Sequence, residues 1–241
     1  MSNINIQAYG RIRLLIVLIL PFITITGMAQ IKYKTVNEAE GLQVGDIAEN
    51  FSALDLHNKL FTLNEALGKG PVVIVFYRGQ WCPYCNKHLS HLEDSLQLIY
   101  EKGATVVAIS PEKPESMEQT VKKTHASFSL LYDKGYKISN QFNLTFRPKR
   151  LTITLYNTML NADLKNAHSD ESQRLPIPAT FIIGQDGKIV WRHFDPDYKQ
   201  RSSVLDIVKN IPKTLNSIKD ITPVEAKKNP EEFHMKMILQ Q

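Results

Sequence analysis

The amino-acid sequence predicts an α/β fold in which helices flank a central mixed β-sheet and a β-hairpin precedes it. Three observations lead to this prediction. An unbroken β-branched and aromatic run at 72–77 is typical of a strand buried on both faces. A stripe of leucines at helical spacing follows it, and a second apolar run occupies 104–109. Strand, helix and strand in this order form a parallel crossover.

The N-terminus has the pattern of a secretory signal peptide over residues 1–29. Arg11 and Arg13 precede an uncharged run at 14–25, and small residues follow at 27–29. The alternative is an uncleaved anchor, but the apolar run is shorter than the roughly 20 residues that span a bilayer. We therefore expect export to a periplasmic or other extracytoplasmic compartment, without stable membrane insertion after cleavage.

Residues 30–43 are polar and are interpreted as a leader, with one domain over 44–218 and a charged C-terminal extension over 219–241. Within the domain, alternating apolar residues at 51–63 interrupted by His57-Asn58-Lys59 predict a hairpin at one edge of the sheet.

The helix after the first strand is expected to begin at Pro83 and to continue to Gly103. Residues 143–176 have no clear period. The remaining predictions are helices at 116–124, 136–142 and 204–215, and strands at 128–132, 179–183 and 188–193, the last two joined by an Asp-Gly turn.

Composition argues against a nucleic-acid partner. The net charge is +5, but the basic residues are interleaved with acids and form no stripe with aromatic residues between them. The length of 241 residues suits one catalytic domain with appendages.

Cys82 and Cys85 are the only cysteines and are predicted to be the catalytic residues. A disulfide between them closes so short a loop that it adds little stability, so reactivity explains the pair better. The thiolate is the reactive form of cysteine, and a helix N-terminus stabilises it. With two residues between them, one sulfur can resolve a mixed disulfide formed on the other.

Two other interpretations remain open. Cys82, Cys85, His88 and His91 could bind zinc, although a regular helix converges them poorly and the histidines are otherwise expected to be exposed. Alternatively, the chain is an exported binding domain with a permanently closed disulfide. We expect no metal and no cofactor.

Four segments together resemble the peroxiredoxin-like AhpC/TSA family of the thioredoxin superfamily: 76–85, 108–112, 175–181 and 195–198. The resemblance spans roughly 44–215 and implies a thioredoxin-like fold. Peroxiredoxins carry a Pro-x-x-x-Thr-x-x-Cys motif, whose cysteine falls on Cys85, whose threonine falls on Cys82 and whose proline falls on Arg78. The family's late arginine is replaced by Pro178, which resembles the cis-proline of thioredoxins.

The resemblance implies which side chains meet the substrate. Trp81 resembles the tryptophan that precedes the first cysteine of thioredoxins, and Arg78 could place a positive charge near the sulfurs. Tyr77, Arg78, Trp81 and Pro178 are expected to bind substrate. A further polar cluster has no assigned chemistry beyond a capping role for Asp197 at the last helix; it comprises Asp195, Asp197, Tyr198 and Arg201.

Two functions follow from the resemblance. As an antioxidant thiol-dependent peroxidase, the chain would reduce hydroperoxides through Cys85, with Cys82 as the resolving thiol. As a thiol-disulfide oxidoreductase, it would attack protein disulfides through Cys82, with Cys85 resolving. Either cycle needs an external, thioredoxin-like dithiol reductant.

Overall fold

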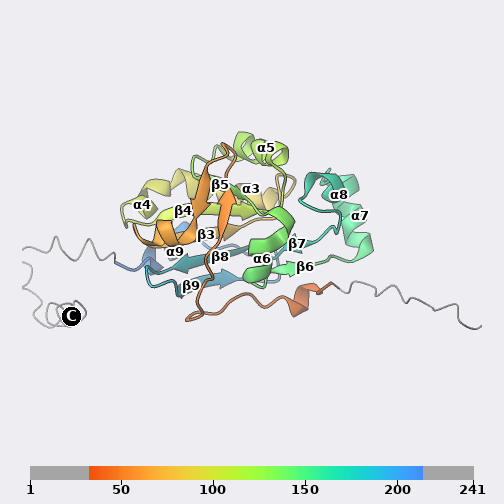
Figure 1. Ribbon diagram of the computed structural model, residues 1–241. Helices are drawn as coiled ribbons and strands as arrows, with labels where there is room; N and C mark the ends of the chain where they lie inside the picture. The colour runs from red at the N-terminus through yellow and green to blue at the C-terminus, as the bar shows by residue number, and fades with distance from the viewer. Residues whose placement is uncertain (1–32, 214–241) are drawn as a thin grey trace, which may run out of the picture. The chain divides into compact units, whose positions relative to one another are not determined.

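The computed structural model describes residues 33–213, and these are built around a five-stranded sheet of order β5-β4-β3-β8-β9 (Figure 1). Strands β3 (Val72–Phe76), β4 (Thr105–Ser110) and β5 (Ser129–Tyr132) are parallel, while β8 (Ala179–Ile183) and β9 (Ile189–Phe194) are antiparallel. The predicted central mixed sheet is confirmed.

Strand β3 lies at the centre and is buried throughout, as its unbroken apolar run predicted. Its side chains alternate between two cores. Val73 and Val75 pack in the core that includes Leu89 and Leu92 of the following helix, while Ile74 and Phe76 pack in a second core on the other face. Both faces of the sheet are therefore covered.

The helix after β3 is divided in two. Helix α3 (Pro83–Asp94) and helix α4 (Leu96–Tyr100) meet at Ser95, whose φ of −123° and ψ of 13° leave the helical region. The expected single helix to Gly103 was therefore wrong. The break was invisible in the pattern because Leu92 and Leu96 on its two sides are both buried in one core, so the apolar stripe continues through it.

The predicted hairpin is confirmed. Strand β1 (Ser52–Leu54) pairs antiparallel with β2 (Leu60–Thr62), and helix α2 (Leu63–Leu67) follows directly. A bridge between Asp55 and Leu131 attaches the hairpin to the edge strand β5, so it covers that edge of the sheet as expected.

The other predicted helices are present with altered bounds. The last is shorter than expected because Ile211 is extended, with ψ of 122°. The elements are α5 (Pro114–Thr124), the 3-10 turn η3 (Lys134–Tyr136) with α6 (Lys137–Gln141), and α9 (Val204–Asn210).

The segment without a clear period forms a peripheral unit. Strands β6 (Thr145–Phe146) and β7 (Leu175–Pro176) pair and enclose helices α7 (Arg150–Met159) and α8 (Leu164–Ala167). Helix α7 buries only Ile153. Leu151, Leu155 and Met159 recur along it at a spacing of four, and this helical period was the available signal that the sequence prediction missed.

The N-terminal part of the described chain is hydrogen-bonded to the domain. It contains the turn η2 (Val36–Glu38), and the Leu42 amide donates to the Phe142 carbonyl at 3.2 Å. The expected signal peptide and the C-terminal extension over 219–241 lie outside the described residues. No helix within 33–213 has the length and apolar character needed to cross a membrane.

Replacing Phe142 should measure how much the second core stabilises the fold. Its ring is fully buried, 5.0 Å from that of Phe76 and 5.1 Å from that of Phe181. We expect Phe142→Ala to lower the free energy of unfolding by about 3–5 kcal/mol in urea titrations. The control is Leu205→Ala, 76% exposed on α9, which should change it by less than about 0.5 kcal/mol. Equal midpoints for the two variants would contradict this assignment of the core.

Candidate active site

The cysteine pair lies where strand β3 gives way to helix α3. Cys82 is the N-cap residue of α3 and Pro83 is its first residue, as predicted. The Cys82 sulfur accepts a hydrogen bond from the Cys85 amide at 3.3 Å. Both cysteines are free thiols, and their exposed fractions are 0% and 1%. The helix N-terminus therefore directs its unpaired N–H groups at a buried pair of sulfurs.

The loop before the pair requires a glycine. Gly79 has a φ of +155°, and a Cβ atom there would lie 2.5 Å from the Glu112 Oε1 and 2.5 Å from the Trp81 Nε1. Any side chain would displace the loop that positions Cys82.

Arg78 places a buried positive charge on the pair. Its Nη2 donates to the Cys82 sulfur at 3.3 Å and its Nη1 donates to the Tyr156 hydroxyl at 3.0 Å. The guanidinium carbon lies 3.8 Å from the ring centre of Tyr198, 4.9 Å from that of Trp81 and 5.1 Å from that of Tyr156. The three aromatic rings thus surround the guanidinium group that contacts Cys82.

Arg201 supplies a second cation from the loop between β9 and α9. Its Nη2 donates to the Cys85 sulfur at 3.6 Å. Arg201 of the polar cluster thus contacts the pair directly and Tyr198 contacts Arg78, whereas Asp195 accepts the Asp197 amide within the same loop. The expected capping role of Asp197 was wrong, because Ser203 caps α9 by accepting the Asp206 amide.

The surroundings of the two sulfurs shift their pKa values in opposite directions. Burial opposes ionisation of Cys85, but the hydrogen bond from the Cys82 thiol and the guanidinium groups of Arg78 and Arg201 hold the pKa of Cys85 well below its ordinary value. Burial and the neighbouring Cys85 raise the pKa of Cys82. Cys85 is therefore the sulfur whose ionisation the surroundings favour.

Glu112 is a buried carboxyl group that contacts the loop preceding Cys82. Its Oε1 accepts the Gln80 amide at 2.7 Å, and its Oε2 accepts the Thr120 hydroxyl at 3.4 Å. Burial raises the pKa of Glu112 to about 8, and the nearby Cys85 adds to the effect. Glu112 is the last residue of the 108–112 segment that resembles the family, and the resemblance implied no role for it. Its place directly after a parallel neighbour of β3 was the available signal, because carboxyl ends of parallel strands share one edge.

A cavity of about 310 Å³ opens beside Arg78. Its walls are largely apolar and aromatic, with two exposed basic residues, Arg147 and Lys149. Its lining also includes Thr152, Tyr156, Pro178 and Tyr198. Since Arg78 lines this cavity and also contacts Cys82, it joins the cavity to the sulfurs.

Two of the four residues expected to bind substrate line the cavity, and the other two are buried away from it. Arg78 and Pro178 line the cavity. Trp81 is buried with its ring 5.0 Å from that of Tyr156. Tyr77 is 1% exposed and does not line the cavity. Burial, together with the nearby Glu112, raises the pKa of its hydroxyl.

The resemblance of Pro178 to a cis-proline does not extend to its backbone. All peptide bonds within residues 33–213 are trans. The Ile177 amide donates to the Leu144 carbonyl at 2.9 Å, which fixes the chain between β7 and β8 just before Pro178.

The histidines of α3 do not join the sulfurs. His88 is buried, contrary to expectation, with its Nε2 3.1 Å from the Ser202 hydroxyl, and burial lowers the pKa of His88 to about 3. The position of His88 on the core face of α3, beside Leu89 and Leu92, explains its burial. In the described part of the chain, no three His, Cys, Asp or Glu side chains come together as metal ligands.

Arg201 offers a direct test of the charge on Cys85. Arg201→Gln should raise the pKa of Cys85, because a cation beside its sulfur is lost. The pH dependence of iodoacetamide labelling, with the adduct located by mass spectrometry, measures this pKa. Arg150→Gln, an exposed arginine of α7, is the control. An unchanged labelling profile in Arg201→Gln would show that this cation does not act on the sulfur.

Glu112 should make stability depend on pH. Its pKa is about 8 in the folded protein against an ordinary 4.5, so folding takes up a proton between these values. The free energy of unfolding should then fall as pH rises from about 5 to 8, by up to about 1.4 kcal/mol per pH unit from this group.

The isosteric Glu112→Gln variant should lose this component of the slope in urea titrations across that range, while Glu118→Gln, an exposed neighbour on α5, should keep it. A slope shared by Glu112→Gln and the wild type would refute the assignment.

Comparison with known proteins gives the family. The sequence model of the AhpC/TSA family matches residues 44–192. A thiol-disulfide oxidoreductase ResA of Bacillus cereus is 26% identical over 154 residues, which cover 64% of this chain and 70% of the relative. The putative peroxiredoxin bcp of Haemophilus influenzae is 32% identical over 103 residues, covering 43% of this chain and 66% of the relative.

Solved structures agree on the fold. Peroxidoxin BcpB from Mycobacterium tuberculosis superposes with a TM-score of 0.52 at 22% identity, covering 69% of this chain and 94% of that one. A peroxiredoxin-like protein from Aquifex aeolicus gives 0.54 at 15% identity, covering 71% and 87%. The fold is thus the thioredoxin-like fold of peroxiredoxins. Since the family model matches more than half of the sequence, the chain belongs to the AhpC/TSA family.

Proposed function

We propose that this chain is a thiol-dependent peroxidase in which Cys85 attacks the hydroperoxide and Cys82 resolves the product. One observation favours this most: two guanidinium groups contact the sulfurs of a pair that is buried from solvent. A hydroperoxide is small enough to enter through a narrow opening, whereas a protein disulfide needs an exposed sulfur. Relatives named peroxiredoxin support the same chemistry.

In the first step, the Cys85 thiolate attacks the terminal peroxide oxygen. The O–O bond breaks, Cys85 becomes a sulfenic acid, and the leaving oxygen takes a proton and departs as water or an alcohol. Arg201, which contacts Cys85, stabilises the negative charge that develops on the leaving oxygen.

In the second step, Cys82 resolves the sulfenic acid. Its sulfur attacks that of Cys85, forming a disulfide and releasing the hydroxyl group, which leaves as water with the Cys82 proton. Cys82 stands where peroxiredoxins carry a threonine, so the resolving thiol lies within one helical turn of its target. An external thioredoxin-like dithiol then reduces the disulfide by exchange.

Thiol-disulfide exchange with proteins is the second candidate, and the ResA relatives favour it because they match over 70% of their length. Pro178 in the cavity wall beside Arg78 would then contact the partner's backbone. Cys82 would attack first, which requires its buried sulfur to become exposed.

We also propose that the enzyme is exported. The charge, apolar run and small residues of the first 29 positions are typical of a signal peptide, so we place the mature enzyme outside the cytoplasm. A periplasmic enzyme would receive electrons from an exported dithiol protein.

Single-cysteine variants distinguish the two candidates. After treatment with hydrogen peroxide, Cys82→Ser should accumulate a sulfenic acid on Cys85, because attack occurs but resolution cannot. A dimedone adduct located by mass spectrometry measures this. Cys85→Ser should form little adduct and should consume peroxide no faster than a free thiol.

The reverse pattern would overturn the peroxidase proposal. If Cys82 captures a disulfide-bonded peptide as a stable mixed disulfide in Cys85→Ser, while Cys85 in Cys82→Ser is inert to peroxide, exchange is the function. Double replacement by serine is the control for background labelling.

A further inference from the structure

Helix α7 carries an apolar stripe that no part of residues 33–213 covers. Leu151 is 72% exposed, Leu155 46% and Met159 76%. Their spacing of four places them on one face of the helix. Continuous exposed apolar surface of this kind is uncommon on a monomer and marks a site of interaction.

The chain that contains this stripe is basic between Asp133 and Asp163. From Lys134 to Ala162 the sequence contains five lysines and arginines and no acidic residue. Lys149 and Arg150 are exposed at the N-terminus of α7, and the first turn has no acid. Cations there oppose the helix dipole, so helix stability does not account for them. The patch is complementary to a negatively charged, partly apolar surface.

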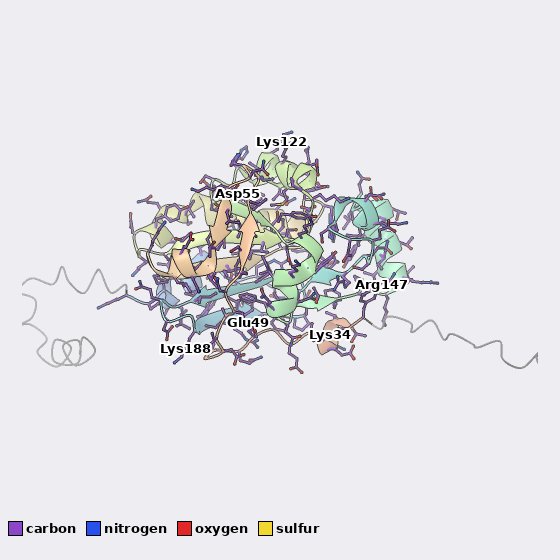
Figure 2. The ribbon with its side chains drawn as sticks, viewed as in Figure 1. Lys34, Glu49, Asp55, Lys122, Arg147 and Lys188 are labelled. Carbon is purple, nitrogen blue, oxygen red and sulfur yellow. The ribbon has the colours of Figure 1, made fainter. Side chains whose placement is uncertain are left out.

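A neighbouring face of the same helix lines the cavity. Thr152 and Tyr156 are among the lining residues, and the Tyr156 hydroxyl accepts a hydrogen bond from Arg78, which contacts Cys82. Arg147 lies at the same end of the molecule as α7 and also lines the cavity (Figures 1 and 2). Whatever α7 binds is therefore next to the opening beside the active site.

We propose that α7 binds peripherally to a membrane surface containing anionic lipids. Leu151, Leu155 and Met159 would enter the boundary between headgroups and acyl chains, and Lys149 and Arg150 would contact lipid phosphates. A second copy of the chain fits less well, because two such basic patches would repel each other. This inference extends beyond the proposed function, since it concerns where the enzyme works and not its reaction.

Hydrogen exchange on the full-length chain tests the proposal at α7 itself. With vesicles of equal parts phosphatidylcholine and phosphatidylglycerol, peptides covering 150–160 should exchange severalfold more slowly than with phosphatidylcholine alone. High salt should remove the effect because it screens the charges. Because exchange is measured for each peptide, protection of α7 is distinguished from membrane binding through the N-terminal apolar run.

Matched variants complete the test. Leu151→Ser with Met159→Ser should lose the protection, whereas Leu205→Ser, an equally exposed leucine on α9, should keep it. Both should react with hydrogen peroxide like the wild type, so failure here leaves the proposed chemistry untouched.

Three results would overturn the proposal. The first is equal protection by both kinds of vesicle, and the second is protection that survives the double variant. The third is slow exchange of α7 without vesicles that the double variant abolishes, because another segment or a second copy would then cover the stripe.

Discussion

The buried cation of Arg78 is the constraint on which the active site depends. A guanidinium with 1% exposure is stable only if a negative group and hydrogen-bond acceptors accompany it, and the shared charge of the cysteine pair provides them. Tyr156 from α7 and Tyr198 from the loop after β9 complete its surroundings. Segments far apart in sequence are thereby fixed around the sulfurs at the end of β3.

The charges around the pair are balanced so that one thiolate persists without solvent. Arg78 and Arg201 stabilise the Cys85 anion, while burial keeps Glu112 protonated near neutral pH and so avoids a second anion beside it. The helix N-terminus at Cys82 adds a further favourable field. Both sulfurs are buried, with exposed fractions of 0% for Cys82 and 1% for Cys85, so these charges act in surroundings that exclude water.

Much of this fold follows from local sequence. The buried run of β3, the Asp-Gly turn before β9 and the position of Cys82 at a helix start depend on neighbouring residues, and each was predicted. The contacts of Arg201 with Cys85 and of Glu112 with Gln80 depend on tertiary packing across long sequence separations, which no local period encodes. The contact of Tyr156 on α7 with Arg78 likewise joins residues far apart in sequence, so the helical spacing of α7 alone could not reveal it.

The most direct measurement is the rate at which the reduced enzyme reacts with one equivalent of hydrogen peroxide. Stopped-flow tryptophan fluorescence reports it, because Trp81 packs over the site, and mass spectrometry identifies the product. A thiolate held by two guanidinium groups should react orders of magnitude faster than free cysteine at the same pH and end as a Cys82–Cys85 disulfide. A rate no higher than that of free cysteine would contradict the role given to these cations.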